Sequence, residues 1–284
     1  MQSADQGTRR VTRRNLLLIA GLGILLTIPT IWCGFPELGH DSINHAQRLE
    51  EFSAQFRTGD WYPRWLTEAN GGLGSPTFFY YPPVGYYLSV PWVGLWAPGH
   101  RAAWQSLGLT SAFVLIASGF LLYSWLSGWA GKRGALWGAL IYMALPWHTA
   151  IDLYNRGALA EFCGFVWMPL ALLGADRLRK GQRGAVLMMA TGYSLLVLTH
   201  LPTAELLSPV LLAYSFFFGP RERRTRLVIE TGCAMLLGMC LAAIYVLPAI
   251  FRQDAASLHI LGGFGFYDYR KWFLGAGHSF DSRL

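Results

Sequence analysis

The sequence predicts an all-α, polytopic integral membrane protein, a helix bundle with amphipathic helices beside the membrane, and three observations support this. Of the 284 residues, 53% are hydrophobic and only 14% are charged, whereas a soluble domain carries about 25% charged residues. Apolar runs of spanning or near-spanning length recur along the chain. The arginines cluster in short segments between these runs, as the positive-inside rule describes for cytoplasmic loops. We therefore attribute the formal net charge of +7 to membrane orientation, and we expect the lipid bilayer, not nucleic acid, as the partner.

The first apolar run predicts an uncleaved signal anchor. It covers residues 15–33, and no small-x-small cleavage site follows it. About 18 apolar residues, at 1.5 Å each, are enough to cross a bilayer. The run is preceded by four arginines, Arg9, Arg10, Arg13 and Arg14. These should hold residues 1–14 in the cytoplasm of a bacterial cell, with the chain in the inner (plasma) membrane.

Six later runs predict a transmembrane bundle over residues 103–250. They cover 103–126, 135–151, 159–175, 184–199, 203–219 and 227–250. The segments RLRKGQRG (177–184) and PRERRTR (220–226) are strongly basic and should be cytoplasmic, and the weaker GKRG (131–134) agrees with them. This orientation puts the turns at 152–158 and 199–205 outside, together with a long loop at 34–102.

One further apolar run, PPVGYYLSVPWVGLWAP at 82–98, does not fit this count, because a full crossing there would invert every later loop. We interpret it as an interfacial or re-entrant helix, since its tyrosines and tryptophans suit the headgroup level. The alternative is a true span, with one later pair of runs forming a single bent helix.

The stretch GHDSINH (39–45) opens the long outer loop. Apolar residues then recur at intervals of three and four, at Ile43, Ala46, Leu49, Phe52 and Phe56. This spacing predicts an amphipathic helix that lies flat on the membrane.

Asp41 falls at or next to the N-cap of that helix, where the helix dipole favours a carboxylate. One interpretation makes Asp41 only a cap, and the other gives it a chemical role. His40 and His45 are likewise open to two interpretations, as solvated loop histidines or as metal ligands.

Three motifs carry a resemblance to a known family. GDWYPRW, the YYPP segment and YNRGALAE (154–161) resemble the bacterial membrane family labelled 6-pyruvoyl-tetrahydropterin synthase-related. More distantly, the topology and the acidic residue after the first span resemble the GT-C glycosyltransferases, which use polyprenyl-phosphate sugars. The family label suggests pterin chemistry, but the HxH pair of soluble pterin synthases is missing from this sequence.

The GT-C resemblance implies a catalytic base or a ligand of a divalent metal ion in the first outer loop, and the matching position is Asp41. Many members have two neighbouring acids there, where this chain has His40 and Asp41. Glycosyl transfer also needs a cation that stabilises the leaving phosphate, and Arg64 and Arg156 are the outer candidates. Their alternative roles are headgroup contact for Arg64 and a structural ion pair for Arg156 with Glu161.

His200 and Glu205 form a third candidate group, in the turn between two runs of only about 16 residues. Ionisable residues at that depth are candidates for substrate binding, although a simple outer turn containing Pro202 explains them equally. The chain ends with residues 251–284, an outer segment without a closing helix. GT-C enzymes and members of the resembled family run longer, so we expect a truncated chain.

Two functions therefore follow from the sequence. The first is a glycosyltransferase that takes a sugar from a polyprenyl-phosphate donor on the extracytoplasmic face. The second is a non-catalytic membrane protein, either a transporter component or an assembly factor. The polar residues concentrate in outer loops and not along the spans, where a transport pathway would need them. This distribution favours the enzyme.

Overall fold

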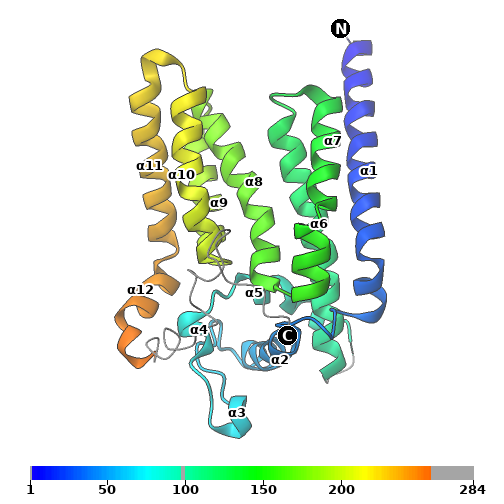
Figure 1. Cartoon of the computed structure of the whole chain (residues 1–284), viewed down its shortest axis with the longest axis vertical. Helices are drawn as coiled ribbons and strands as arrows, with labels where there is room; N and C mark the ends of the chain where they lie inside the picture. Colours follow the sequence, from blue (N-terminus) through cyan, green and yellow to red (C-terminus); the bar gives the residue numbers. More distant parts are fainter. Residues whose placement is uncertain (1, 97–99, 257–284) are drawn as a thin grey trace, which may run out of the picture.

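Long helices stand side by side in the computed structural model, which describes residues 2–96 and 100–256 (Figure 1). The bundle contains α1 (Gln2–Cys33), α6 (His100–Leu126), α7 (Gly131–Ala144), α8 (Leu159–Arg179), α9 (Ala185–Val197), α10 (Leu201–Phe218) and α11 (Arg224–Leu241). Short helices gather at one end of it: α2 (Ser42–Arg57), α3 (Ala69–Gly72), α4 (Thr77–Tyr80), α5 (Val84–Val93) and α12 (Ala243–Phe251). A π-helix, η1 (Trp147–Arg156), joins α7 to α8 at the same end, and two 3₁₀ turns complete the described elements, η2 (Arg221–Arg223) and η3 (Gln253–Ala255). Most of the predicted outer segment 251–284 lies outside the described residues.

The described helices confirm the prediction of an all-α chain with several apolar spans. Four of them are long and apolar enough to cross a membrane: Arg10–Cys33, Arg101–Leu126, Leu159–Arg179 and Leu201–Phe218. A fifth span exists if Arg221–Leu241 and Ala243–Phe251, which meet at a bend of 72°, count as one broken helix. The helices α7 and α9 have 14 and 13 residues and are therefore only about 20 Å long.

The surface of α1 has the character expected beside lipid. Only 22% of its apolar window is buried inside the protein. Large apolar side chains lie exposed along it: Leu17, Leu18, Ile24, Leu25, Ile28 and Trp32. In water such a surface would be an aggregation hazard, whereas in a bilayer it is the surface that a spanning helix needs.

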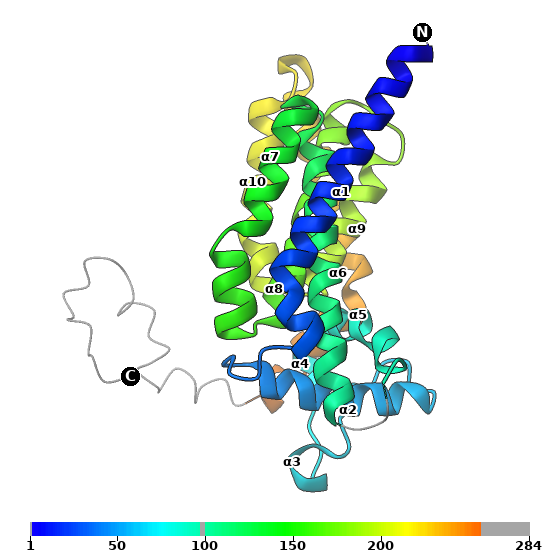
Figure 2. The same ribbon diagram turned by 90° about the vertical axis from the view of Figure 1, so that its right-hand side faces the viewer.

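The basic segments all lie at the end of the bundle opposite the short helices (Figures 1 and 2). The N-terminal part of α1 reaches this end, and so do the α6–α7, α8–α9 and α10–α11 turns. The predicted cytoplasmic segments are thus on one side of the molecule. The long loop after α1, the π-helix and α12 are on the other.

Helix α5 covers most of the apolar run whose interpretation was open. It has ten residues, about 15 Å, which is too short to cross a bilayer. The Val84 backbone N–H donates to Leu198 O at 3.1 Å, at the end of α9. This length and position agree with an interfacial or re-entrant helix.

Two clusters of buried apolar residues hold the molecule together, and α8 contributes to both. One cluster joins α1, α2, α5, α6 and α7 to the first half of α8. The other joins the second half of α8 to α9, α10 and α11. Gly174 and Gly192 lie where α8 and α9 touch, and a Cβ at either would press on the backbone of the other helix. Small residues of this kind allow membrane helices to pack closely.

Candidate functional site

Two separate stretches of the sequence meet backbone to backbone at the end of the bundle that carries the short helices. The Asp41 N–H donates to Arg156 O at 2.9 Å, which joins the start of α2 to the end of η1. Gly157 follows η1 with a φ of +61°, in the left-handed region that glycine adopts most easily. A Cβ on Gly157 or on Gly39 would collide with Ser42 Oγ. Glycine at these two positions therefore allows the segments GHDS (39–42) and NRGA (155–158) to approach each other closely.

Asp41 occupies the N-cap position of α2, but its side chain makes no capping hydrogen bond. Its side chain is exposed. The Asp41 carboxylate is therefore not committed to the helix, which removes the simplest structural explanation for it.

Asp41 lines a cavity of about 360 Å³, in which several predicted residues come together. The lining residues come from α2, α4, η1, α8, α10 and α12. They are Asp41, Tyr80, Tyr81, Pro82, Arg156, Ala158, Ala160, Glu161, His200, Leu201, Pro202 and Tyr245. Four of the residues selected from the sequence, Asp41, Arg156, Glu161 and His200, thus share one cavity.

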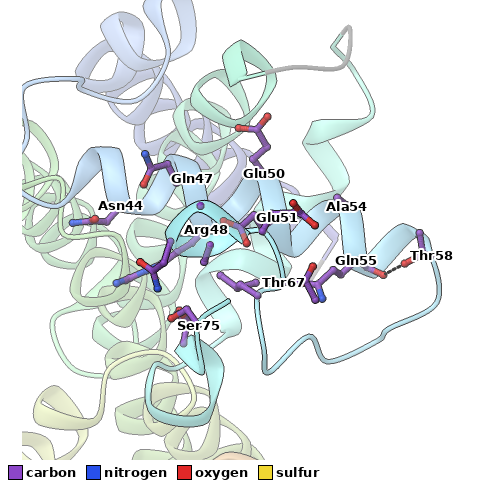
Figure 3. Close-up of a pocket in the computed structure, with 16 residues that line it drawn as sticks. Asn44, Gln47, Arg48, Glu50, Glu51, Ala54, Gln55, Thr58, Thr67 and Ser75 are labelled. Carbon is purple, nitrogen blue, oxygen red and sulfur yellow. Dashed lines mark hydrogen bonds between the residues drawn. The ribbon is translucent and has the colours of Figure 1, made fainter. Parts of the chain in front are cut away.

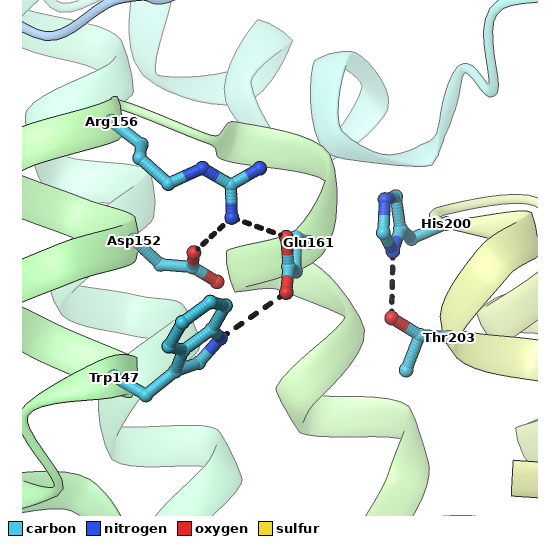
Figure 4. A network of polar contacts seen from close by, with 6 residues as sticks. All are labelled: Trp147, Asp152, Arg156, Glu161, His200 and Thr203. Carbon is cyan, nitrogen blue, oxygen red and sulfur yellow. Dashed lines mark hydrogen bonds and ion pairs between the residues drawn. The ribbon is translucent and has the colours of Figure 1, made fainter. Parts of the chain in front are cut away.

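An ion-pair network forms one wall of this cavity (Figure 4). Nη1 of Arg156 donates to Asp152 Oδ1 at 2.7 Å and to Glu161 Oε2 at 2.6 Å. Trp147 Nε1 donates to the other oxygen of Glu161 at 3.2 Å. The second terminal nitrogen of Arg156 points away from both carboxylates (Figure 4), and the side chain is 35% exposed. The guanidinium thus keeps one donor edge for a further acceptor.

Asp152 is the buried member of the network, with no exposed surface. Among the described residues, its Oδ2 has no hydrogen-bond partner. Burial, and after it the negative charge of Glu161, raises the pKa of Asp152 to about 7, although Arg156 opposes the shift. The net charge beside Arg156 therefore changes near neutral pH.

His200 lies across the cavity from Glu161 (Figure 4). Its Nδ1 is 2.6 Å from Thr203 Oγ1, one turn into α10. Partial burial lowers the pKa of His200, and the charge of Glu161 offsets this in part. The imidazole is therefore largely neutral at pH 7 and can donate or accept a hydrogen bond.

Arg64 and Glu205 lie outside the cavity lining. Arg64 Nη2 donates to Ile244 O at 3.0 Å, and its guanidinium carbon lies 4.4 Å from the centre of the Tyr62 ring. It therefore fastens α12 to the long loop. Glu205 is exposed on the first turns of α10.

The contact between α12 and the long loop has two further hydrogen bonds. Tyr80 Oη donates to Arg252 O at 2.6 Å, and Tyr245 Oη donates to Tyr80 O at 3.0 Å. Because Tyr80 and Tyr245 also line the cavity, the position of α12 shapes the candidate site.

The two histidines near Asp41 differ in environment. His40 is exposed. His45 is only 2% exposed, and its Nδ1 lies 2.8 Å from Tyr86 Oη, so it is not a solvated loop residue. Burial, and after it the charge of Arg48, lowers the pKa of His45 to about 3. In the described part of the chain, no group of three His, Cys, Asp or Glu side chains could hold a metal ion. A role of His40 and His45 as metal ligands therefore stays a prediction from the sequence.

The sequence matches no protein-family model, and comparison with curated proteins and with solved structures also gives no match. The resemblance to the 6-pyruvoyl-tetrahydropterin synthase-related family and to GT-C glycosyltransferases stays a prediction from the motifs.

Some residues of the site were not selected from the sequence. The spacing of Asp152 and Arg156, four residues apart, gave a signal for their ion pair. Trp147 and Tyr245 gave none, because the chain has 12 tryptophans and 13 tyrosines and residue type does not single out these two.

Proposed function

We propose that this chain is the core of a membrane glycosyltransferase, related to the resembled family and to GT-C enzymes. It would transfer a sugar from a polyprenyl-phosphate donor on the extracytoplasmic face of the bacterial inner membrane. One observation carries the proposal: an uncommitted carboxylate and a guanidinium with a free edge, Asp41 and Arg156, share a cavity at the end of the bundle opposite the basic segments. The positive-inside rule puts that end outside.

The chemistry of the transfer can be assigned to these residues. A hydroxyl of the acceptor attacks the anomeric carbon of the sugar, and Asp41 takes the hydroxyl proton. The bond between that carbon and the phosphate oxygen breaks, and the polyprenyl phosphate leaves with the bonding electron pair. Arg156 stabilises the negative charge on the phosphate through its free edge.

The two carboxylates beside Arg156 tune how well it binds a phosphate. With both ionised, the group of Asp152, Arg156 and Glu161 carries a net charge of −1, which repels an anion. A proton on Asp152, whose pKa is about 7, makes the group neutral. Donor binding should therefore be tighter at pH 6 than at pH 8.

Donor binding can be measured apart from transfer, in nanodiscs that contain the full-length protein. We expect undecaprenyl phosphate to raise the unfolding temperature of the wild type, because a ligand that binds only the folded state stabilises it. Arg156→Lys keeps the charge but loses the planar fork of guanidinium. The apparent affinity for undecaprenyl phosphate, obtained from the rise in unfolding temperature, should therefore fall at least tenfold.

Arg57→Lys is the matched control, because Arg57 is exposed at the end of α2 and lies outside the cavity. Protection that is equal in wild type, Arg156→Lys and Arg57→Lys would exclude the phosphate role of Arg156. A wild type that gains no protection from the lipid would favour the non-catalytic alternative.

A further inference from the structure

A second and larger hollow lies along the polar face of α2. It has a volume of about 750 Å³ and runs between α2 and residues 66–77 of the long loop (Figure 3). We call it the α2 groove. Its α2 wall is formed by Asn44, Gln47, Arg48, Glu50, Glu51, Ala54, Gln55 and Thr58. From Asn44 to Thr58 this wall is about 21 Å long, which suits an extended ligand.

The α2 groove contains two hydrogen-bond acceptors without partners. Oε2 of Glu51 and Oε1 of Gln55 are shielded from solvent, and neither has a hydrogen-bond partner in the described structure. Gln55 Nε2 donates to Trp65 O at 3.0 Å, which fixes the amide so that Oε1 is the free atom. Glu51 and Gln55 are one turn apart and face the same side. The backbone N–H groups of Ala69 and Glu68 act on the Glu51 carboxylate, so only its Oε2 and the Gln55 Oε1 are left without a donor. Shielded acceptors without donors are costly, and a rotation of either flexible side chain would turn its free oxygen toward a ligand that brings donors.

The loop that forms the opposite wall is rigidly shaped. Leu66 and Ser75 exchange backbone hydrogen bonds at 2.8 and 2.9 Å, and Asn70 Nδ2 donates to Gly74 O at 3.0 Å. Gly74 has a φ of +82°, and a Cβ there would collide with the indole of Trp65. The sequence ANGGLG thus fixes the wall in advance of any ligand.

The groove offers donors and acceptors in similar numbers. Arg48 and Asn70 bring N–H donors, Glu51 and Gln55 bring the free acceptors, and Thr67 brings a hydroxyl that does both. An anion would meet three lining carboxylates, Glu50, Glu51 and Glu68. A ligand rich in hydroxyl groups matches both kinds of partner, because each hydroxyl donates and accepts.

We propose that the α2 groove binds a neutral carbohydrate, and that this carbohydrate is the acceptor of the transfer. The acceptor role rests on the proposed function. The groove adjoins the candidate site, because Arg48, which lines the groove, stacks over the ring of Tyr81 at 4.8 Å, and Tyr81 lines the cavity that contains Asp41. A saccharide in the groove therefore presents its end to the catalytic carboxylate.

Binding is tested without any donor, so the result does not depend on transfer. The full-length protein in nanodiscs is titrated with the methyl glycosides of glucose, mannose, galactose and arabinose, and binding is followed by saturation-transfer NMR. We expect at least one glycoside to bind. Glu51→Gln replaces the free acceptor with a donor of the same size, and Gln55→Met removes the other acceptor at equal length. Each should weaken binding about tenfold or more.

Glu37→Gln is the control, since it removes the same charge from an exposed residue outside the groove, and it should bind as the wild type does. The unfolding temperature of each groove variant shows whether it is still folded. If Glu51→Gln or Gln55→Met has lost its fold, the other variant is used to test binding. The proposal is overturned if no glycoside binds, if neither groove variant weakens binding, or if spermidine binds there and the glycosides do not. If sugars bind as expected but undecaprenyl phosphate gives no protection, the groove stands and the proposed transfer fails.

Discussion

Two aspartates of the candidate site have opposite environments, and the difference decides what each can do. Asp41 is exposed, and its side chain makes no capping bond, so its carboxylate is free to approach a bound hydroxyl. Asp152 is fully buried and has one oxygen without a partner. A buried carboxylate without a full set of donors is costly to ionise. Asp41 is therefore the carboxylate that an acceptor can reach, and Asp152 is the better sensor of pH.

Asp41→Asn tests the base directly. We expect transfer to be lost by at least a hundredfold, because an amide cannot take the acceptor proton. The unfolding temperature should change little, since no capping bond is lost. Transfer is measured from a radiolabelled polyprenyl-phosphate sugar, with Glu37→Gln as the neighbouring acid control. An Asp41→Asn protein that keeps its activity would rule out the catalytic role.

Asp152→Asn tests the pH dependence of stability. Burial raises the pKa of Asp152 to about 7, whereas an unfolded aspartate titrates near about 3.9. At a pH between these two pKa values, the folded protein binds one more proton than the unfolded chain. The contribution of Asp152 to the free energy of unfolding is therefore complete below about pH 4 and is lost as the pH rises to about 7.

Asparagine is neutral at every pH, so the variant should lack this loss. The unfolding temperature of Asp152→Asn, minus that of the wild type, should therefore increase from pH 5 to pH 8 in thermal scans. Parallel curves for the two proteins would contradict the raised pKa.

At the scale of elements, α2 illustrates what the sequence can and cannot predict. Apolar residues spaced three and four apart in the sequence predicted this helix. Ala46, Leu49 and Phe52 are buried, as that pattern requires. Ile43 is 53% exposed, whereas Ser42 and His45 in the same turn are buried, so the buried face begins on a different side of the helix from the one that the pattern assigned to Ile43. The polar face contains the α2 groove, and hydrophobic spacing carries no signal for it, since the covering wall comes from residues 66–77.

The candidate site was predictable to a similar extent. The sequence selected Asp41 through the GT-C resemblance, Glu161 and His200 as ionisable residues near membrane spans, and Arg156 as an outer cation for the leaving phosphate. Their meeting in one cavity depends on the Asp41–Arg156 backbone bond and on Gly157, which are tertiary facts. Arg64 was selected by the same rule, yet it holds α12 in place, because residue type does not reveal which partner a long side chain reaches.

Gly74→Ala tests the rigid wall of the groove. The new methyl group would have to occupy the space of the Trp65 indole at a φ of +82°, so we expect a loss of about 1–3 kcal/mol of stability in the loop. Limited proteolysis should cut residues 66–75 faster, and glycoside binding should weaken.

Gly72→Ala is the matched control, since Gly72 has a similar φ of +89° but nothing within 4 Å of the added methyl group. Equal effects from the two variants would assign the loss to backbone strain alone, and the contact with Trp65 would then have no role.

At the scale of the whole molecule, the basic segments and the candidate site lie at opposite ends of the bundle. A reporter fused after Gln182 should therefore be cytoplasmic, and one fused after Arg156 should be extracytoplasmic, as shown by paired alkaline phosphatase and green fluorescent protein fusions. The reverse result at either position would overturn the orientation and with it the extracytoplasmic site.

The contact between α12 and the long loop has a consequence for biogenesis. Arg64 and Tyr80 bind carbonyl groups that lie 180 and 172 residues later in the chain. At about 5–20 residues per second of synthesis, the loop would cross the membrane roughly 10 to 35 s before α12 exists. During that interval the cavity lacks Tyr245, and, in the proposed orientation, the loop is open to proteases and chaperones on the outer side of the membrane. Completion of the cavity therefore has to wait for α12, and a ribosome that stalls before α12 would leave a chain in the membrane without a finished cavity.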